Sequence, residues 1–263
     1  MTQVEQAIEK VGTWRSSDHH YSVDGGPWIP GITSIIRAGI DKSNFLLPWG
    51  KGLTADAALD NIEKLRAMLD DVGRAPAKAW LMQAADAQSD AAAKLGTQIH
   101  DLTEQFDRGQ TPDVAPELMP WVEAYHRFLE DWKPVFKSRE RYVVNLEQGY
   151  AGTYDSICVL GGKLTMMDLK TGKSHYAESR LQLVALGRAE FIGVSGDPKR
   201  YPMPAIEQHA ILHVRPDAYE RGYQLYRLDV NESDWRAFLG ALAVYRWSQQ
   251  RPSKGEPMMK ENR

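Results

Sequence analysis

Apolar residues recur with two different spacings along the chain, and the change between them separates a helical first half from a strand-rich second half. From Thr54 to Leu69 apolar side chains return every three or four residues, which is the period of an amphipathic helix, and Gly73 ends the segment. An Ala-rich stretch from Lys78 to Arg108 is expected to form two helices. A further helix is predicted from Asp113 to Trp132, before Pro134.

From Val135 onward the spacing indicates strands. Residues 135–144 alternate loosely between apolar and polar, and two short apolar runs then flank Gly161-Gly162, a pattern typical of a β-hairpin. The remaining predicted elements are a helix over 177–192, a loop over 193–204, strands over 209–214 and 223–230, and a helix over 232–250. A short strand leading into a helix is expected over 28–36. This order predicts an α/β (α+β) fold with a mixed central sheet flanked by helices.

The hairpin sets two carboxylates against each other. If the residues that flank Gly161-Gly162 pair across the turn, paired positions sum to 323, and Asp155 lies opposite Asp168. Their Cβ atoms would then be roughly 4.5–5.5 Å apart on one face of the sheet. Because side chains alternate along a strand, Lys170 shares that face with Asp168. The pattern predicts two carboxylates and an ammonium at one place.

Two interpretations of this group compete. An Asp in a hairpin is ordinarily exposed, with an adjacent Lys as its exposed partner. Here, however, the neighbours on both faces of the predicted hairpin are apolar, which indicates a strand pair buried on both sides. Unpaired carboxylates are costly to bury, so a divalent metal held by Asp155 and Asp168 is the preferred interpretation. The backbone carbonyl of Leu169 lies between Asp168 and Lys170 and is available as a further oxygen ligand.

Composition excludes several classes of protein. The chain of 263 residues has one cysteine, Cys158, which rules out an intramolecular disulfide, a four-cysteine zinc site and an iron–sulfur cluster. No apolar run approaches the ~20 residues of a membrane span, and the first residues lack a signal-peptide pattern, so we expect a soluble, cytoplasmic protein without membrane association. The net charge of −3 does not indicate a nucleic-acid-binding protein, but it is only weak evidence against one, because a local basic groove is sufficient for binding.

A set of four ordered elements resembles the PD-(D/E)XK nuclease superfamily, with the RecB-type and phage-type exonucleases as the most similar branch. The elements are Gly96-Thr97-x-x-His100, Gly152-x-x-Asp155, Asp168-x-Lys170 and a helix that contains Gln182. Leu186 stands where the RecB-type pattern often has a tyrosine. The resemblance implies a restriction-endonuclease-like core and a phage or bacterial context.

The resemblance also implies roles for individual residues. His100 becomes a ligand to the metal of Asp155 and Asp168, which suits Mn²⁺ as well as Mg²⁺ because imidazole is a softer donor. Lys170 would orient or deprotonate the attacking water, or stabilise developing charge. Glu104, one helical turn after His100, is a supporting group of the site or a surface acid. Gln182 contacts a DNA phosphate or the site carboxylates, or only flanks the apolar stripe of its helix.

The leading hypothesis is a Mg²⁺- or Mn²⁺-dependent exodeoxyribonuclease that acts on the ends of double- or single-stranded DNA in recombination, repair or end processing. A structure- or sequence-specific endonuclease and a DNA-binding module with a vestigial site remain as alternatives. A single-strand annealing protein or a helicase is a further expected partner. The predicted organisation is a mostly helical N-terminal elaboration over residues 1–95, a nuclease core over 96–250 and a flexible tail over 251–263.

Overall fold

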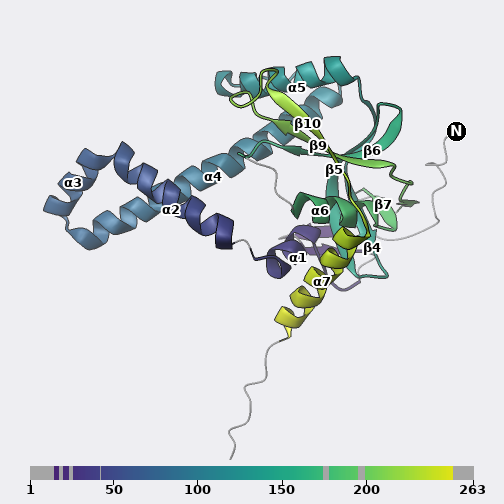
Figure 1. Cartoon of the computed structure of the whole chain (residues 1–263), viewed down its shortest axis with the longest axis horizontal. Helices are drawn as coiled ribbons and strands as arrows, with labels where there is room; N and C mark the ends of the chain where they lie inside the picture. Colours follow the sequence, from purple (N-terminus) through teal and green to yellow (C-terminus); the bar gives the residue numbers. More distant parts are fainter. Residues whose placement is uncertain are drawn as a thin grey trace, which may run out of the picture.

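A seven-stranded mixed sheet forms the centre of the protein (Figure 1). The computed structural model describes residues 15–17, 20–23, 26–41, 43–173, 178–194 and 199–250. The strand order is β10-β9-β6-β5-β4-β7-β8. The strands are β4 (Val135–Asn145), β5 (Tyr150–Leu160), β6 (Lys163–Lys170), β7 (Phe191–Gly193), β8 (Arg200–Pro202), β9 (Gln208–Val214) and β10 (Tyr223–Leu228). All neighbours are antiparallel except β6 and β9, which run parallel.

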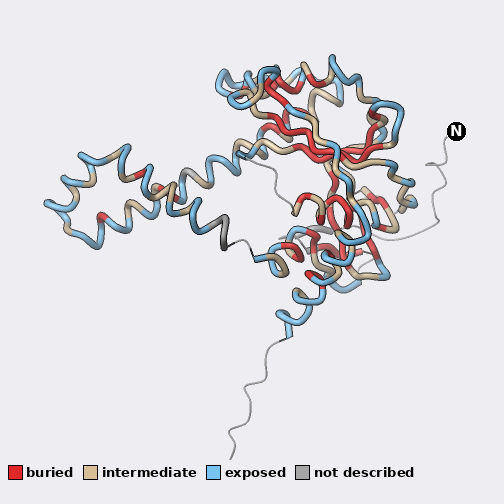
Figure 2. The backbone as a smooth tube through the Cα atoms, in the orientation of Figure 1, coloured by how far each residue is buried: buried red, intermediate tan, exposed pale blue. Residues whose placement is uncertain are grey.

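Helices cover both faces of this sheet, as the sequence predicted. On one face, α1 (Ile32–Gly39), α6 (Glu178–Gly187) and α7 (Glu232–Gln249) pack against a core that includes Ile157 and Met166. On the other face, α4 (Arg74–Asp107) and α5 (Met119–Trp132) pack against Cys158, Leu160, Met167 and Leu169. The hairpin strands therefore lie in the most deeply buried part of the chain (Figure 2).

The predicted hairpin is confirmed, and so is its register. The recorded pairs run from Leu160↔Lys163 to Ser156↔Met167, and each pair sums to 323. Gly161 and Gly162 have φ of 57° and 80°, the left-handed conformation that a two-residue type I′ turn requires at both positions. Glycine adopts this conformation without the steric cost of a Cβ atom, so the local sequence is sufficient to fix the turn.

The helical half differs in detail from the sequence prediction. The stretch expected to form two helices is the single 34-residue helix α4, because its Ala-rich interior favours a helix and Pro76 falls in the first turn, where proline is tolerated. The helix predicted over 54–69 is instead α2 (Ser43–Asp60) and α3 (Ile62–Asp71), separated at Asn61, which leaves helical geometry. Together α2, α3 and the first part of α4 project from the sheet as an arm whose surface is mostly exposed (Figures 1 and 2).

Short elements account for the other differences. The 3-10 helix η2 (Pro116–Leu118) and α5 occupy the helix predicted from residue 113. Helix α6 ends at Gly187, five residues early, because the chain then joins β4: Glu190 N donates to the Val144 carbonyl oxygen at 2.9 Å, and β7 pairs with β4. Strands β7 and β8 follow in regions predicted as helix and loop. The strand expected before α1 is β3 (Ile29–Pro30), which joins β1 (Arg15–Ser17) and β2 (His20–Ser22) in a small sheet. The predicted tail lies outside the described residues.

No helix in the described ranges combines the length and the apolar character needed to cross a bilayer.

Candidate functional site

Asp155 lies where the central sheet opens on both sides of β5. Toward β6, the recorded pairs end at Ser156↔Met167, whereas β6 continues to pair with β9 as far as Lys170↔His213. Toward β4, Arg139↔Ser156 and Arg141↔Tyr154 are paired, but the position between them is skipped. The strands therefore separate at Asp155, and its backbone leaves the regular ladder. The side chain compensates, because Asp155 Oδ2 accepts a hydrogen bond of 2.7 Å from Leu169 N.

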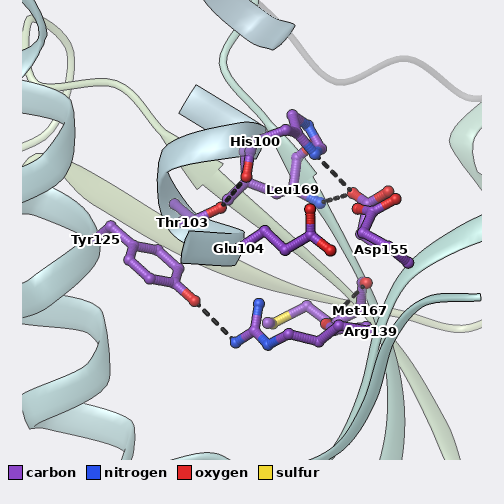
Figure 3. Close-up of a pocket in the computed structure, with 10 residues that line it drawn as sticks. His100, Thr103, Glu104, Tyr125, Arg139, Asp155, Met167 and Leu169 are labelled. Carbon is purple, nitrogen blue, oxygen red and sulfur yellow. Dashed lines mark hydrogen bonds and ion pairs between the residues drawn. The ribbon is translucent and has the colours of Figure 1, made fainter. Parts of the chain in front are cut away.

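His100 reaches the same opening from α4. Its Nδ1 lies 3.6 Å from Asp155 Oδ2, and its Nε2 lies 3.1 Å from the Leu169 carbonyl oxygen (Figure 3). When Nε2 carries the ring proton and donates to Leu169 O, Nδ1 keeps a lone pair that points toward Asp155. Gly96 allows this close approach of α4, because a Cβ atom there would already lie 3.3 Å from Thr171 Oγ1.

Glu140 completes a group of three possible metal ligands. Among the residues that the structure describes, His100, Glu140 and Asp155 offer ligand atoms that all lie within 4.8 Å of one another. Ligands around one Mg²⁺ or Mn²⁺ ion are at most roughly 4.4 Å apart, so small side-chain movements suffice to bring all three onto one ion. Glu140 keeps an exposed side, yet desolvation of its carboxyl and the negative charges of Asp155 and Glu104 raise its pKa to about 8.

Asp168 and Lys170 form a second, adjacent pair. Lys170 Nζ donates a hydrogen bond of 3.0 Å to Asp168 Oδ1 and lies 2.8 Å from Oδ2. The Asp168 side chain is only 3% exposed, and burial raises its pKa while the Lys170 ammonium opposes the rise. Burial lowers the pKa of Lys170, but the carboxylates of Asp168 and Asp155 outweigh it and hold that pKa above its usual value.

The donor set fits a hard or borderline divalent cation. An imidazole nitrogen and carboxylate oxygens suit Mg²⁺ and Mn²⁺, and the Leu169 carbonyl oxygen retains a second lone pair. Within the described residues, Asp168 Oδ2 is buried and accepts no hydrogen bond of good geometry, although Lys170 Nζ is close. A buried carboxylate oxygen in that condition is a natural point of contact for a cation.

The two supporting residues lie at the edges of the site. Glu104 lines the cavity beside His100 (Figure 3). Its Oε1 accepts a hydrogen bond of 2.5 Å from Arg108 Nη2. Gln182 Oε1 accepts from Lys170 Nζ at 3.4 Å. The structure thus brings His100, Asp155 and Leu169 together, with Lys170 linking Asp168 to Gln182, whereas Asp168 is not a member of the closest ligand group.

A groove of about 480 Å³ opens onto the site. One wall is the small-residue face of α4, formed by Ala92, Ala93, Gly96 and Thr97, and the other is the end of β6 with Thr171 and Gly172. Four acidic residues line the groove: Asp101, Glu104, Glu140 and Asp155. Lys170 also lines it and contributes a positive charge. Without a bound cation, the groove would repel an anionic substrate.

Sequence reasoning missed Glu140. It stands in the run Arg139-Glu140-Arg141, which has the appearance of an exposed strand face. A glutamate within a strand is unusual, and this was the one sign in the sequence that Glu140 has a special role. Which residue lies beside Glu140 depends on the β4–β5 register, which shifts between Phe136 and Ser138. Glu140 also has a φ of 45°, which a strand pattern does not reveal.

The chain matches no protein-family model and no curated protein. Two solved structures similar to it are those of an alkaline exonuclease, LHK-Exo, from Laribacter hongkongensis. One is 12% identical with a TM-score of 0.30, and the other, in complex with dAMP, is 10% identical with the same TM-score. Each match covers 58% of this chain and 77% of the other. A TM-score of 0.30 is too low to support a conclusion about fold or function. The description of the fold and of the site therefore depends only on the geometry given above.

Proposed function

We propose that this protein is a metal-dependent deoxyribonuclease that hydrolyses phosphodiester bonds, and that it acts as an exonuclease on DNA ends. The observation that carries the proposal is the convergence of His100, Glu140 and Asp155 beside the buried Asp168–Lys170 pair. The ordered motifs at Gly96, Gly152, Asp168 and Gln182 support the same conclusion from the sequence.

Phosphodiester hydrolysis makes a large demand on this site. Hydrolysis of phosphate esters is so slow without a catalyst that an enzyme must lower the barrier by on the order of 20 kcal/mol, whereas one general acid or base contributes only about 10²–10⁴-fold. A bound Mg²⁺ or Mn²⁺ supplies activation of water and neutralisation of charge on the phosphate. His100, Glu140, Asp155 and Asp168 would hold it, with the Leu169 carbonyl as a further donor.

Lys170 has a separate part in the proposed reaction. Its pKa is held above the usual value, so its side chain is an ammonium at neutral pH. An ammonium donates hydrogen bonds and adds positive charge, so we infer that Lys170 stabilises the negative charge that develops on a phosphate oxygen. Asp168 and Gln182 orient it from two sides, through contacts of 3.0 and 3.4 Å.

The groove beside α4 favours an extended polymer strand as the substrate. Its small side chains leave open space next to the ligands, and its acidic lining makes binding of a polyanion depend on the cation. We therefore expect DNA to enter this groove only in the presence of a divalent metal.

A nuclease assay on matched DNA substrates tests the function. Linear DNA, single- and double-stranded, and a covalently closed circle of the same sequence are incubated with Mg²⁺ or Mn²⁺ and analysed on gels over time. We expect the linear DNA to shorten progressively and the circle to persist. The two matched variants are Asp155→Asn, which removes a ligand charge, and Asp131→Asn, which makes the same change at an exposed ion pair that does not line the groove.

Three other outcomes would each reject part of the proposal. Conversion of the circle to linear fragments by the wild type would replace the exonuclease with an endonuclease. Tight DNA binding without degradation of any substrate would indicate a binding module. Equal cleavage by wild type and Asp155→Asn would show that the activity does not arise at this site.

A further inference from the structure

A buried ion pair joins α4 to β4 beneath the proposed metal ligands. Arg139 Nη1 is ion-paired with Asp107, the last residue of α4. Arg139 Nη2 donates a hydrogen bond of 2.9 Å to the Tyr125 hydroxyl of α5, as Figure 3 shows. The Tyr125 hydroxyl in turn donates to Asp107 Oδ2 at 2.7 Å. The three side chains therefore form a closed ring of polar contacts between three elements.

This ring is shielded from solvent. The side chains of Asp107 and Arg139 are 6% and 17% exposed, Tyr125 is buried, and the Arg139 guanidinium lies 3.3 Å from the centre of the Phe136 ring. A buried ion pair is a poor source of stability, because well-packed apolar residues of similar volume often do as well or better. What such a pair does supply is a fixed geometry between the elements that it joins.

The ring joins the same two elements that carry two of the ligands. His100 and Asp107 are seven residues apart on α4, which places them on the same helix face two turns apart. Glu140 follows Arg139 directly on β4. The contact between Asp107 and Arg139 therefore sets how closely α4 approaches β4 at the position where His100 and Glu140 must meet.

The backbone of Glu140 explains how both side chains can serve this one face. Successive side chains of a regular strand point to opposite faces of the sheet, but Arg139 and Glu140 both line the cavity beneath His100. The left-handed φ of 45° at Glu140 interrupts the alternation. A residue without glycine's freedom keeps this conformation only when its surroundings hold it there, and the anchored Arg139 is its immediate neighbour.

We propose that Asp107, Tyr125 and Arg139 form a positioning network that holds Glu140 in the metal ligand group. Arg139 is a positioning residue that acts through the backbone of its neighbour, and Asp107 and Tyr125 act through Arg139. The inference rests on the proposed metal site and adds to it the device that maintains its geometry.

A double-mutant cycle tests this network. Asp107→Asn is made in the wild type and in Glu140→Gln, and the Mn²⁺ dissociation constant of each folded protein is measured by calorimetry, with urea unfolding recorded in parallel. Loss of a group that orients metal ligands typically weakens binding about 10- to 100-fold. We expect a loss of that size when Glu140 is present and a change of less than about twofold when it is Gln, because the network has nothing left to position.

A second triad of the same composition provides the matched control. Asp131 of α5 pairs with Arg221, in the turn before β10, at 2.7 Å and accepts a hydrogen bond of 2.6 Å from the hydroxyl of Tyr223, the first residue of β10. Asp131→Asn should leave Mn²⁺ binding unchanged. Tyr125→Phe removes one hydroxyl and serves if Asp107→Asn does not fold, with an expected loss of at least about threefold that again disappears in Glu140→Gln.

Two results would overturn the network. If the Asp107 and Tyr125 variants bind Mn²⁺ as tightly as the wild type, the ring does not position a ligand. If they lose the same factor with and without Glu140, the ring supports the fold in general. Failure of the wild type itself to bind Mn²⁺ would instead reject the metal site, and the positioning role with it.

Discussion

Replacement of Lys170 by methionine should expose the electrostatic cost of burying Asp168. The change removes the ammonium but keeps most of the side-chain volume, so the Asp168 carboxyl stays buried without its cation. Breaking a buried ion pair by removal of one partner typically costs about 3–5 kcal/mol. The Lys170 side chain is 32% exposed, so water screens part of this interaction. We therefore expect Lys170→Met to lower the unfolding free energy by at most about 3 kcal/mol.

The loss should depend on pH with a defined sign. Burial already raises the pKa of Asp168, and removal of Lys170 raises it further. Above the unfolded pKa of about 4, such a carboxyl binds more protons in the folded than in the unfolded chain, so the unfolding free energy falls as pH rises, by at most about 1.4 kcal/mol per pH unit. The difference between wild type and Lys170→Met should therefore grow as pH rises from 5 to 8, toward a limit of about 3 kcal/mol.

Urea unfolding at several pH values measures this difference. Lys163→Met is the matched control, because Lys163 begins the same strand and is exposed, and its unfolding free energy should stay within about 0.5 kcal/mol of the wild type. Added Mn²⁺ should narrow the difference for Lys170→Met, since a divalent cation near Asp168 replaces the missing charge. A difference that does not change between pH 5 and 8 would refute the reasoning and show that water already screens the pair.

Three further predictions concern the proposed activity. Lys170→Ala should reduce DNA cleavage at least about 10²-fold in a gel assay and leave metal-dependent DNA binding intact. Unchanged turnover would show that Lys170 has no part in catalysis. Asp155→Asn should abolish Mn²⁺ binding in calorimetry while the circular dichroism spectrum is retained, and wild-type affinity would exclude Asp155 as a ligand. Because Glu140, with a pKa of about 8, must lose its proton to bind a cation, Mn²⁺ affinity should increase from pH 7.0 to 8.5 by at most about eightfold from this group. The increase should be smaller in Glu140→Gln, and an equal increase in both proteins would contradict this role.

The sequence by itself determined the central hairpin. Gly161-Gly162 permits the left-handed turn, and the turn fixes a register in which every recorded pair follows from the residue numbers. Alternation of side chains then explains why apolar residues fill both faces of β5 and β6. These features depend on interactions between residues near each other in the chain, so local pattern is sufficient to predict them.

The helical boundaries were less accessible to the same reasoning. Continuous helix propensity carries α4 through 34 residues, and the chain leaves helical geometry at Asn61, where the apolar period had predicted continuation. Helix α6 ends at Gly187 because the chain then pairs with β4, a strand far earlier in the sequence, through Glu190 and β7. Contacts between distant segments override periodicity at such points.

Only the tertiary structure decided how the site is assembled. The sequence placed Asp155 opposite Asp168, but the strands separate there, and the Asp155 carboxylate accepts the Leu169 amide instead. Glu140 enters the ligand group through an irregular β4 backbone, anchored beside it by the Asp107–Arg139 pair. Those arrangements depend on where strands part and how a helix docks on the sheet, and both are set by packing between residues far apart in the chain, which no local pattern encodes.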